Sequence, residues 1–237
     1  HNGKNYEEHI EEHKHEMKDD DKKIMHYVKE IELNPDNADA HFNLGMLYGK
    51  KRRKNDAILE YQKAIRLKPD FIEARTRLSQ VYGEEQQYNE SIAELRKVLE
   101  IDPKNASAYR NIGLAYYRMG FLEKALAELK SALDIAPNDA ETHYAMENVL
   151  YGMGLHDEAV LELKKSIELN PKYKEAYNNL GFIYYERGMI DEAVEKFRKV
   201  IELDPNFVEA YSNIGLIYCE KGMFEEAIVI LKKAIDI

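Results

Sequence analysis

The sequence is poor in cysteine and in long apolar runs, and each shortage excludes a class of protein. Among the 237 residues there is one cysteine, Cys219, so no disulfide can form within the chain and the redox compartment stays open. No apolar run approaches the roughly 18 residues that a membrane-spanning helix requires. We therefore expect a soluble chain without a membrane span, with a cytoplasmic location favoured over the others.

Positive charge is also in short supply. The chain has 34 Lys and Arg against 44 Asp and Glu, which gives a formal net charge of −10. Because nucleic-acid affinity is built from clustered Lys and Arg, we expect no nucleic-acid partner and favour a basic protein or peptide segment. The sequence has no nucleophile elbow, phosphate-binding glycine loop or pair of catalytic carboxylates. No enzymatic activity, catalytic residue or cofactor is therefore expected.

Proline is scarce too, and its placement is the most regular feature of the chain. The six prolines are Pro35, Pro69, Pro103, Pro137, Pro171 and Pro205, so every interval is 34 residues. A fixed period of this size indicates one supersecondary element stacked on itself. The period predicts six repeats, at 38–71, 72–105, 106–139, 140–173, 174–207 and 208–237. Residues 21–37 before them are expected to be the second helix of a partial repeat. The acidic, His-rich segment at 1–20 is expected to be a degraded helix or a tail.

Each repeat contains two blocks of apolar residues at spacings of three and four, which is typical of two amphipathic helices. A glycine such as Gly188 separates the blocks in four repeats, and Arg52 takes its place in the first repeat. A left-handed residue there would end the first helix. Small residues such as Gly181 and Ala193 are expected to let the two backbones approach closely, while large residues such as Phe197 fill the complementary spaces.

These residues carry a resemblance to the tetratricopeptide repeat. In the fifth repeat the family pattern reads Tyr177, Leu180, Gly181, Tyr184, Ala193, Phe197 and Pro205. The resemblance covers residues 38–237 in six copies, although Arg75 replaces the first aromatic in the second copy. It implies an all-α α-solenoid of stacked antiparallel helix pairs, wound into a right-handed superhelix with the first helices lining a concave groove. It also implies a non-catalytic scaffold that binds an extended or helical peptide segment in that groove.

The groove residues are expected on the first helices, outside the core stripe. Four repeats place an asparagine before a Leu-Gly or Ile-Gly dipeptide, and such a ladder can hydrogen-bond the amides of an extended peptide. Aromatic residues gather in the middle repeats beside three arginines, and the C-terminal half is acidic, so we expect a groove with two poles of charge. The alternative is that these side chains are solvated or contact neighbouring repeats. The expected groove residues are Asn43, Arg77, Arg110, Asn111, Tyr117, Arg118, Tyr144, Asn148, Tyr151, Asn179, Phe182, Tyr185 and Asn213.

Some tetratricopeptide domains hold a chaperone C-terminal carboxylate with a clamp of Lys, Asn and Arg. The nearest approach in this chain is Asn148, Asn179 and Asn213. The clamp's cation positions are occupied by Tyr144, Glu209 and Asn213, so the charges that would bind a carboxylate are missing. We therefore expect no chaperone carboxylate-tail binding.

Two further charged patterns have competing interpretations. His9 and His13 lie one helical turn apart and are a weak candidate for a shared divalent metal, because no HExxH or CxxC pattern accompanies them. Five cations run through residues 50–54 in the turn of the first repeat. A solvated turn is favoured there, and attraction of an anionic partner is the alternative.

Glu147 is the sharpest departure from the repeat pattern. It occupies the position that Gly181 holds in the next repeat, in the tight contact between the two helices of a pair. A carboxylate there must turn toward solvent or find a donor, because an unpaired buried charge is costly. The sequence therefore predicts a slightly splayed helix pair at 140–173.

The last repeat predicts an exposed end. Leu231, Ala234 and Ile235 lie on a helix that is followed by no polar capping helix, and repeat arrays generally require one. We expect either further sequence after Ile237 or a homo-oligomer formed through this C-terminal helix. Two alternative functions follow: a targeting module of a larger enzyme or of a secretion, pilus or envelope-assembly component, or a self-associating scaffold.

Overall fold

The computed structural model describes residues 19–237, and every regular element in that range is a helix. The predicted all-α fold is confirmed. The metal candidates His9 and His13 and most of the predicted N-terminal segment at 1–20 lie outside the described residues. A helical stretch at 19–33 comes first, followed by α2 (Ala38–Lys50), α3 (Lys54–Leu67), α4 (Ile72–Glu84), α5 (Tyr88–Ile101), α6 (Ala106–Arg118), α7 (Leu122–Ile135), α8 (Ala140–Gly152), α9 (His156–Leu169), α10 (Lys174–Glu186), α11 (Ile190–Leu203), α12 (Val208–Glu220) and α13 (Phe224–Ile235).

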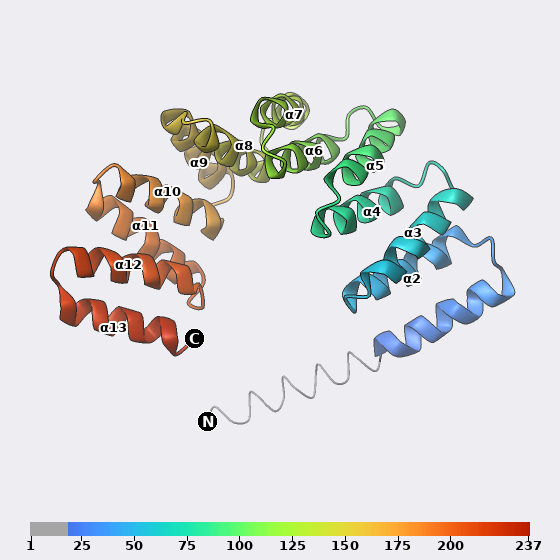
Figure 1. The fold of residues 1–237 in the computed structure, drawn as a ribbon, viewed down its shortest axis with the longest axis horizontal. Coiled ribbons are helices and arrows are strands. Elements are labelled where there is room, and N and C mark those ends of the chain that lie inside the picture. The colour runs from blue at the N-terminus through green and yellow to red at the C-terminus, as the bar shows by residue number, and fades with distance from the viewer. Residues whose placement is uncertain (1–18) are drawn as a thin grey trace. The chain divides into compact units, whose positions relative to one another are not determined.

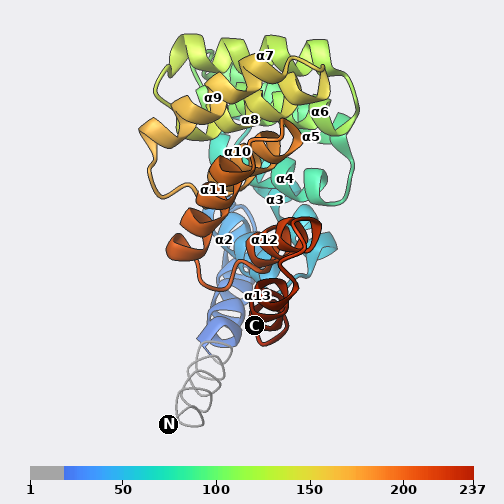
Figure 2. The same cartoon turned by 90° about the vertical axis from the view of Figure 1, so that its left-hand side faces the viewer.

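The helices form two compact units. The N-terminal unit contains the described residues up to Met119, and the C-terminal unit runs from Gly120 to Ile237. Within each unit, consecutive helices pack side by side as antiparallel pairs, for example α2 with α3 and α10 with α11 (Figure 1). Figure 2 faces the C-terminal unit and shows α10 to α13 following one another in the stack. Each unit is thus a tetratricopeptide-type α-solenoid.

Apolar residues on both helices of a pair build the core and extend it to the next pair. In the C-terminal unit, Phe197 and Val200 of α11 belong to the same buried cluster as Ala210 and Ile214 of α12. The second helix of one repeat therefore packs on the first helix of the next. Because a single pair cannot bury both of its apolar faces, stacking is what makes the repeats stable.

A residue in the left-handed conformation ends the first helix in each of the six repeats. Arg52 has a φ angle of 59°, so the sequence prediction for this position is confirmed, and Gln86 has a φ angle of 60° in the second repeat. The other four turns use glycine. The two side-chain-bearing residues adopt a conformation that is costly for any residue with a Cβ atom.

The small residues on the first helices make room for side chains. A Cβ atom on Gly181 would lie 2.8 Å from the ring of Phe197, and one on Gly215 would lie 2.4 Å from Leu231. The equivalent contact in the first repeat joins Gly45 and Tyr61. The predicted arrangement, in which a large side chain of the second helix fills the space beside a small residue of the first, is confirmed at these three glycines.

The first aromatic position of the family pattern is a hydrogen-bond donor here. In four repeats its side chain donates to the carbonyl oxygen of the proline six residues earlier, which anchors the first helix to the preceding turn. This explains why arginine replaces the aromatic residue in one repeat, since a guanidinium donates as well. The pairs are His41 with Pro35, Arg75 with Pro69, His143 with Pro137 and Tyr211 with Pro205.

We predict that Gly181→Ala lowers the free energy of unfolding by about 2 kcal/mol, because Phe197 is buried and its ring cannot move aside without strain. Gly83→Ala is the matched control, since the nearest atom to its added Cβ would be Ser91 Oγ at 3.9 Å. That substitution should stabilise the chain by up to about 1 kcal/mol through helix propensity. Urea unfolding followed by circular dichroism measures both. Equal stability of the two variants would contradict the role assigned to Phe197.

Candidate functional site

The first helices of the C-terminal unit carry a repeated hydrogen bond. Tyr151 on α8 donates its hydroxyl to Glu186 Oε2 at 2.5 Å, and Tyr185 on α10 donates to Glu220 Oε1 at 2.6 Å. The hydrogen bond to Glu186 and partial burial raise the pKa of Tyr151 to about 12. The hydrogen bond to Glu220 likewise raises the pKa of Tyr185. These bonds join α8 to α10 and α10 to α12, so the three first helices form one surface.

We call this surface the acidic first-helix face. Phe182 lies on α10 with 42% of its surface exposed, three residues from Tyr185, and Leu216 on α12 is 51% exposed. The face therefore combines apolar and aromatic groups with carboxylates. Its predicted groove residues are Tyr144, Asn148, Tyr151, Asn179, Phe182, Tyr185 and Asn213, and its carboxylates are Glu186, Glu209 and Glu220.

Glu147 lies beneath this face and is almost fully buried, with 3% of its surface exposed. Asn179 Nδ2 donates to Glu147 Oε2 at 2.9 Å and also lies 3.4 Å from the hydroxyl of Tyr144. Burial raises the pKa of Glu147 to about 7, and the hydrogen bond from Asn179 partly opposes that rise. Of the two predicted alternatives, the carboxylate has found a donor.

The prediction of a splayed fourth helix pair is wrong. Helices α8 and α9 pack together as extensively as α10 and α11. Leu163 of α9, at the position that Phe197 holds in the next repeat, is completely buried. Because Glu147 bonds to Asn179 of the following repeat, it is accommodated without opening its own pair.

The asparagines of the predicted ladder are partly engaged within the protein. Asn213 Nδ2 lies 3.4 Å from Asn178 Oδ1, and Asn178 in turn donates to Glu209 at 3.0 Å. Asn148 donates to the backbone carbonyl of Tyr144 at 2.9 Å. An asparagine amide carries two hydrogens and an acceptor oxygen, so these contacts leave part of each amide for a ligand. The sequence analysis did not predict these asparagine contacts. For the hydrogen bonds from Tyr151 to Glu186 and from Tyr185 to Glu220, the sequence signal was a Glu that recurs 35 residues after a Tyr.

The N-terminal unit has two adjoining hollows along its first helices. The larger, of about 430 Å³, is lined by Asn111 and Arg118 of α6 together with Gln80 of α4. The smaller, of about 220 Å³, is lined by Arg77 and again by Gln80. Arg77 donates to Gln80 Oε1 at 3.1 Å. Within residues 19–237 neither arginine is paired with a carboxylate, so both guanidinium charges are available to a ligand.

The remaining predicted groove residues are half-buried. Asn43 lies on α2, and Arg110 and Tyr117 lie on α6. Arg110 already interacts with other groups of the protein. The structure therefore brings Arg77, Asn111 and Arg118 to the hollows of the N-terminal unit and leaves these three residues outside them.

The cation run in the first repeat is largely neutralised. Lys50 pairs with Asp20 at 3.0 Å, and Lys51 pairs with Asp21. Arg53 pairs with Asp56 at 2.8 Å, while Lys54 meets Glu84 and Glu85 of the next repeat. These contacts support the interpretation of this segment as a charged, solvated turn.

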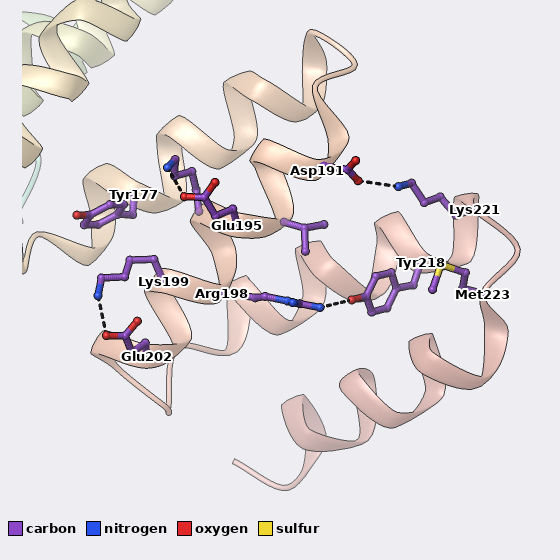
Figure 3. A pocket seen from close by; sticks show the side chains of 11 residues that line it. Tyr177, Asp191, Glu195, Arg198, Lys199, Glu202, Tyr218, Lys221 and Met223 are labelled. Carbon is purple, nitrogen blue, oxygen red and sulfur yellow. Dashed lines mark hydrogen bonds and ion pairs between the residues drawn. The ribbon is translucent and has the colours of Figure 1, made fainter.

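A further hollow, of about 760 Å³, lies along α11 and is bordered by α10 and α12 (Figure 3). Its lysines are matched by carboxylates, and Arg198 donates to the hydroxyl of Tyr218 at 2.9 Å. This local matching leaves the hollow with little net charge to select a ligand. The ion pairs are Lys196 with Glu195 at 2.8 Å, Lys199 with Glu202 at 2.6 Å and Lys221 with Asp191 at 3.2 Å.

The part of the chain that the structure describes has neither a cluster suited to a metal ion nor a helix suited to spanning a membrane. No group of three or more His, Cys, Asp or Glu side chains is arranged to hold a metal ion there. None of the described helices has the length and apolar character needed to cross a bilayer.

The repeat pattern and the helix pairs match known family models. Models described as tetratricopeptide repeats match residues 38–71, 106–139 and 208–237. A model described as a TPR repeat matches residues 80–120, 148–188 and 183–222. The chain belongs to the tetratricopeptide repeat family. Family membership makes it a protein-interaction scaffold, in a family that is generally non-catalytic.

Solved structures with this fold include proteins of several kinds. MamA is 28% identical, with 68% of this chain and 95% of MamA covered and a TM-score of 0.59. YrrB, a TPR protein with an unusual peptide-binding site, is 24% identical, with coverages of 79% and 96% and a TM-score of 0.57. The APC/C hetero-tetramer Cut9–Hcn1 is 18% identical, with coverages of 92% and 43% and a TM-score of 0.75. No match to a curated protein was found.

We predict that Glu147 makes stability fall as pH rises. Its pKa is raised from 4.5 to about 7 by folding, so between these values the native state holds a proton that the unfolded chain has released. The stabilising contribution is therefore complete below about pH 4.5 and is lost as pH rises to about 7, a change of about 3 kcal/mol.

The measurement is the unfolding free energy of wild type and Glu147→Gln at about pH 5 and about pH 8. Between about pH 5 and about pH 8 the unfolding free energy of wild type should fall by about 3 kcal/mol relative to that of the variant, because glutamine does not titrate. Glu186→Gln, which removes an exposed carboxylate from the same face, is the control. A wild-type-to-variant difference that stays constant with pH would refute the assignment.

Proposed function

We propose that the acidic first-helix face binds a peptide segment that carries basic side chains. The observation that carries this proposal is the repeated bond from Tyr151 to Glu186 and from Tyr185 to Glu220, with Phe182 exposed close by. Each tyrosine is held in place before a ligand arrives, which reduces the entropy lost on binding. Each carboxylate keeps further lone pairs that can accept hydrogen bonds from Lys or Arg.

Aromatic and apolar groups on the face supply anchoring contacts. Tyrosine rings can receive a cation on their faces, and Phe182 and Leu216 offer apolar surface. The fold is compatible with such binding, because YrrB, a protein of the same fold, is described as having a peptide-binding site. The chemistry thus favours a segment that carries both basic and apolar residues.

The spacing of the tyrosine bonds predicts the register of the peptide. Neighbouring packed helices lie about 8–10 Å apart. An extended chain covers this distance in about three residues, and a helix covers it in about seven. We expect basic residues at positions i and i+3 of an extended partner, or at i and i+7 of a helical one.

The N-terminal unit is proposed to contribute the opposite charge. Arg77 and Arg118 line its hollows with no carboxylate partner among residues 19–237. Acidic side chains of a partner would pair with them, since arginine forms two-pronged hydrogen bonds to carboxylates. A partner with acidic and basic stretches therefore suits the chain better than a uniformly basic one.

A random peptide display library panned on the full chain tests the proposal. We predict enrichment of basic residues with one of the two spacings given above. A labelled enriched peptide should bind at least about tenfold more weakly to Phe182→Ser and to Glu220→Gln, because an anchor and a charge partner are removed. Leu161→Ser, which changes an exposed residue of α9, should bind like wild type.

The choice of variants avoids the buried polar contacts. Asn179→Ala would remove the donor to Glu147, so weakened binding would not separate lost contact from altered packing. Enriched peptides without basic residues, or unchanged affinity in both face variants, would overturn the proposal. Arg77→Gln plus Arg118→Gln tests the N-terminal unit separately, with weaker binding expected for acidic peptides only.

A further inference from the structure

The larger hollow of the N-terminal unit lies where the fourth repeat places a tyrosine. Two periods of 34 residues separate the second repeat from the fourth, so Gly83 on α4 corresponds to Tyr151 on α8. Gly83 lines the hollow of about 430 Å³. A Cβ atom on Gly83 would have one atom within 4 Å, Ser91 Oγ at 3.9 Å. The space beside this glycine is therefore open to a side chain from outside the chain.

The groups that hold the tyrosine in the fourth repeat have counterparts around this hollow. Tyr151 lies edge-on against His156, with the ring centroids 4.8 Å apart, and its hydroxyl donates to Glu186 at 2.5 Å. Two periods earlier in the sequence, Tyr88 corresponds to His156 and Arg118 corresponds to Glu186. Both Tyr88 and Arg118 line the hollow. The second repeat thus keeps an aromatic wall and a polar end but lacks the ring between them.

We propose that a tyrosine side chain of a bound peptide fills this hollow, with its ring beside Tyr88 and its hydroxyl oxygen accepting a hydrogen bond from Arg118. The inference rests on the peptide binding proposed for the N-terminal unit and names a side chain that this unit selects. The hydrogen bond runs in the opposite direction from the one in the fourth repeat, because a guanidinium only donates and a carboxylate only accepts. A phenolic oxygen can do both. Since a guanidinium has five N–H donors, Arg118 can hold a carboxylate of the same peptide as well.

Asn111 at the edge of the hollow is available to the peptide backbone. Its counterpart Asn179 donates to Glu147 at 2.9 Å. In the second repeat Ser79 takes the place of Glu147, and its hydroxyl donates to the carbonyl oxygen of Thr76 in its own helix at 2.7 Å. Among residues 19–237 the side chain of Asn111 therefore has no hydrogen-bond partner. Its amide can bond the main chain of the residue whose ring enters the hollow.

The smaller hollow of the N-terminal unit suits a tyrosine less well. Gly49 lines it and lies one further period before Gly83, so the tyrosine is missing there too. Its volume is only about 220 Å³, and the hydroxyl of Tyr61 would lie 3.8 Å from a Cβ atom on Gly49. The counterpart of the arginine is Glu84, which already pairs with Lys54 at 3.3 Å. The second repeat is therefore the one that offers both space and an uncommitted donor.

Three capped peptides, Glu-Tyr-Glu, Glu-Phe-Glu and Glu-Ala-Glu, test the inference when they are titrated into the full chain and followed by NMR chemical shifts. The tyrosine peptide should bind at least about tenfold more tightly than the alanine peptide, because the ring fills the hollow. It should bind about fivefold more tightly than the phenylalanine peptide, which offers Arg118 no oxygen. Equal binding of all three would overturn the inference and leave the binding of acidic segments standing. Binding of none would overturn both.

Variants of the hollow locate the binding. Gly83→Tyr should abolish the preference for tyrosine over alanine, because the chain then fills its own hollow. Gly83→Tyr combined with Arg118→Glu recreates the tyrosine–glutamate pair of the fourth repeat, so it should be folded by circular dichroism and should also lack the preference. Arg118→Ala should make the tyrosine and phenylalanine peptides bind alike. Gly49→Tyr is the matched control and should keep the preference, since its ring enters the hollow that Arg118 does not line. A preference that survives Gly83→Tyr would overturn the inference.

Discussion

In three repeats the packing of the helix pair depends on a first-helix glycine, which has no side chain. Phe197 and Leu231 can lie fully against the first helix only because Gly181 and Gly215 leave the space beside them empty. This contact sets how closely the two helices of a pair approach, and the approach decides which residues remain to meet the next pair. The buried cluster that joins α11 to α12 follows from it. The stack is thus determined within single pairs and propagated by contact between them.

In the fourth repeat this first-helix position carries a charged side chain and the helix pair still packs closely. Glu147 stands where its neighbours have glycine or serine, and its carboxylate reaches Asn179 in the following repeat. The repeat remains packed, but its stability is now linked to a titrating group and to a neighbour's amide. A core position of this repeat is therefore linked to a position of the candidate binding face.

The helices, their pairing and their register could be predicted because a fixed period repeats the same evidence six times. The position of Arg52 in a left-handed turn was predictable for the same reason. The bond between Glu147 and Asn179 was not, since it depends on the direction that a side chain takes toward another repeat. Nor was the common role of His41 and Arg75, because the sequence shows different residue types where the structure shows one donor function.

The bonds from these side chains to the proline carbonyls have a consequence for how such an array changes in length. Each bond joins a side chain to a backbone oxygen, so it can form whatever side chains the adjoining repeat carries. A segment cut at one proline and inserted at another would carry its own anchor with it. Duplication or loss of whole 34-residue repeats would then preserve the hydrogen bonds between each first helix and the turn before it. Selection could then act on the exposed faces of individual repeats alone.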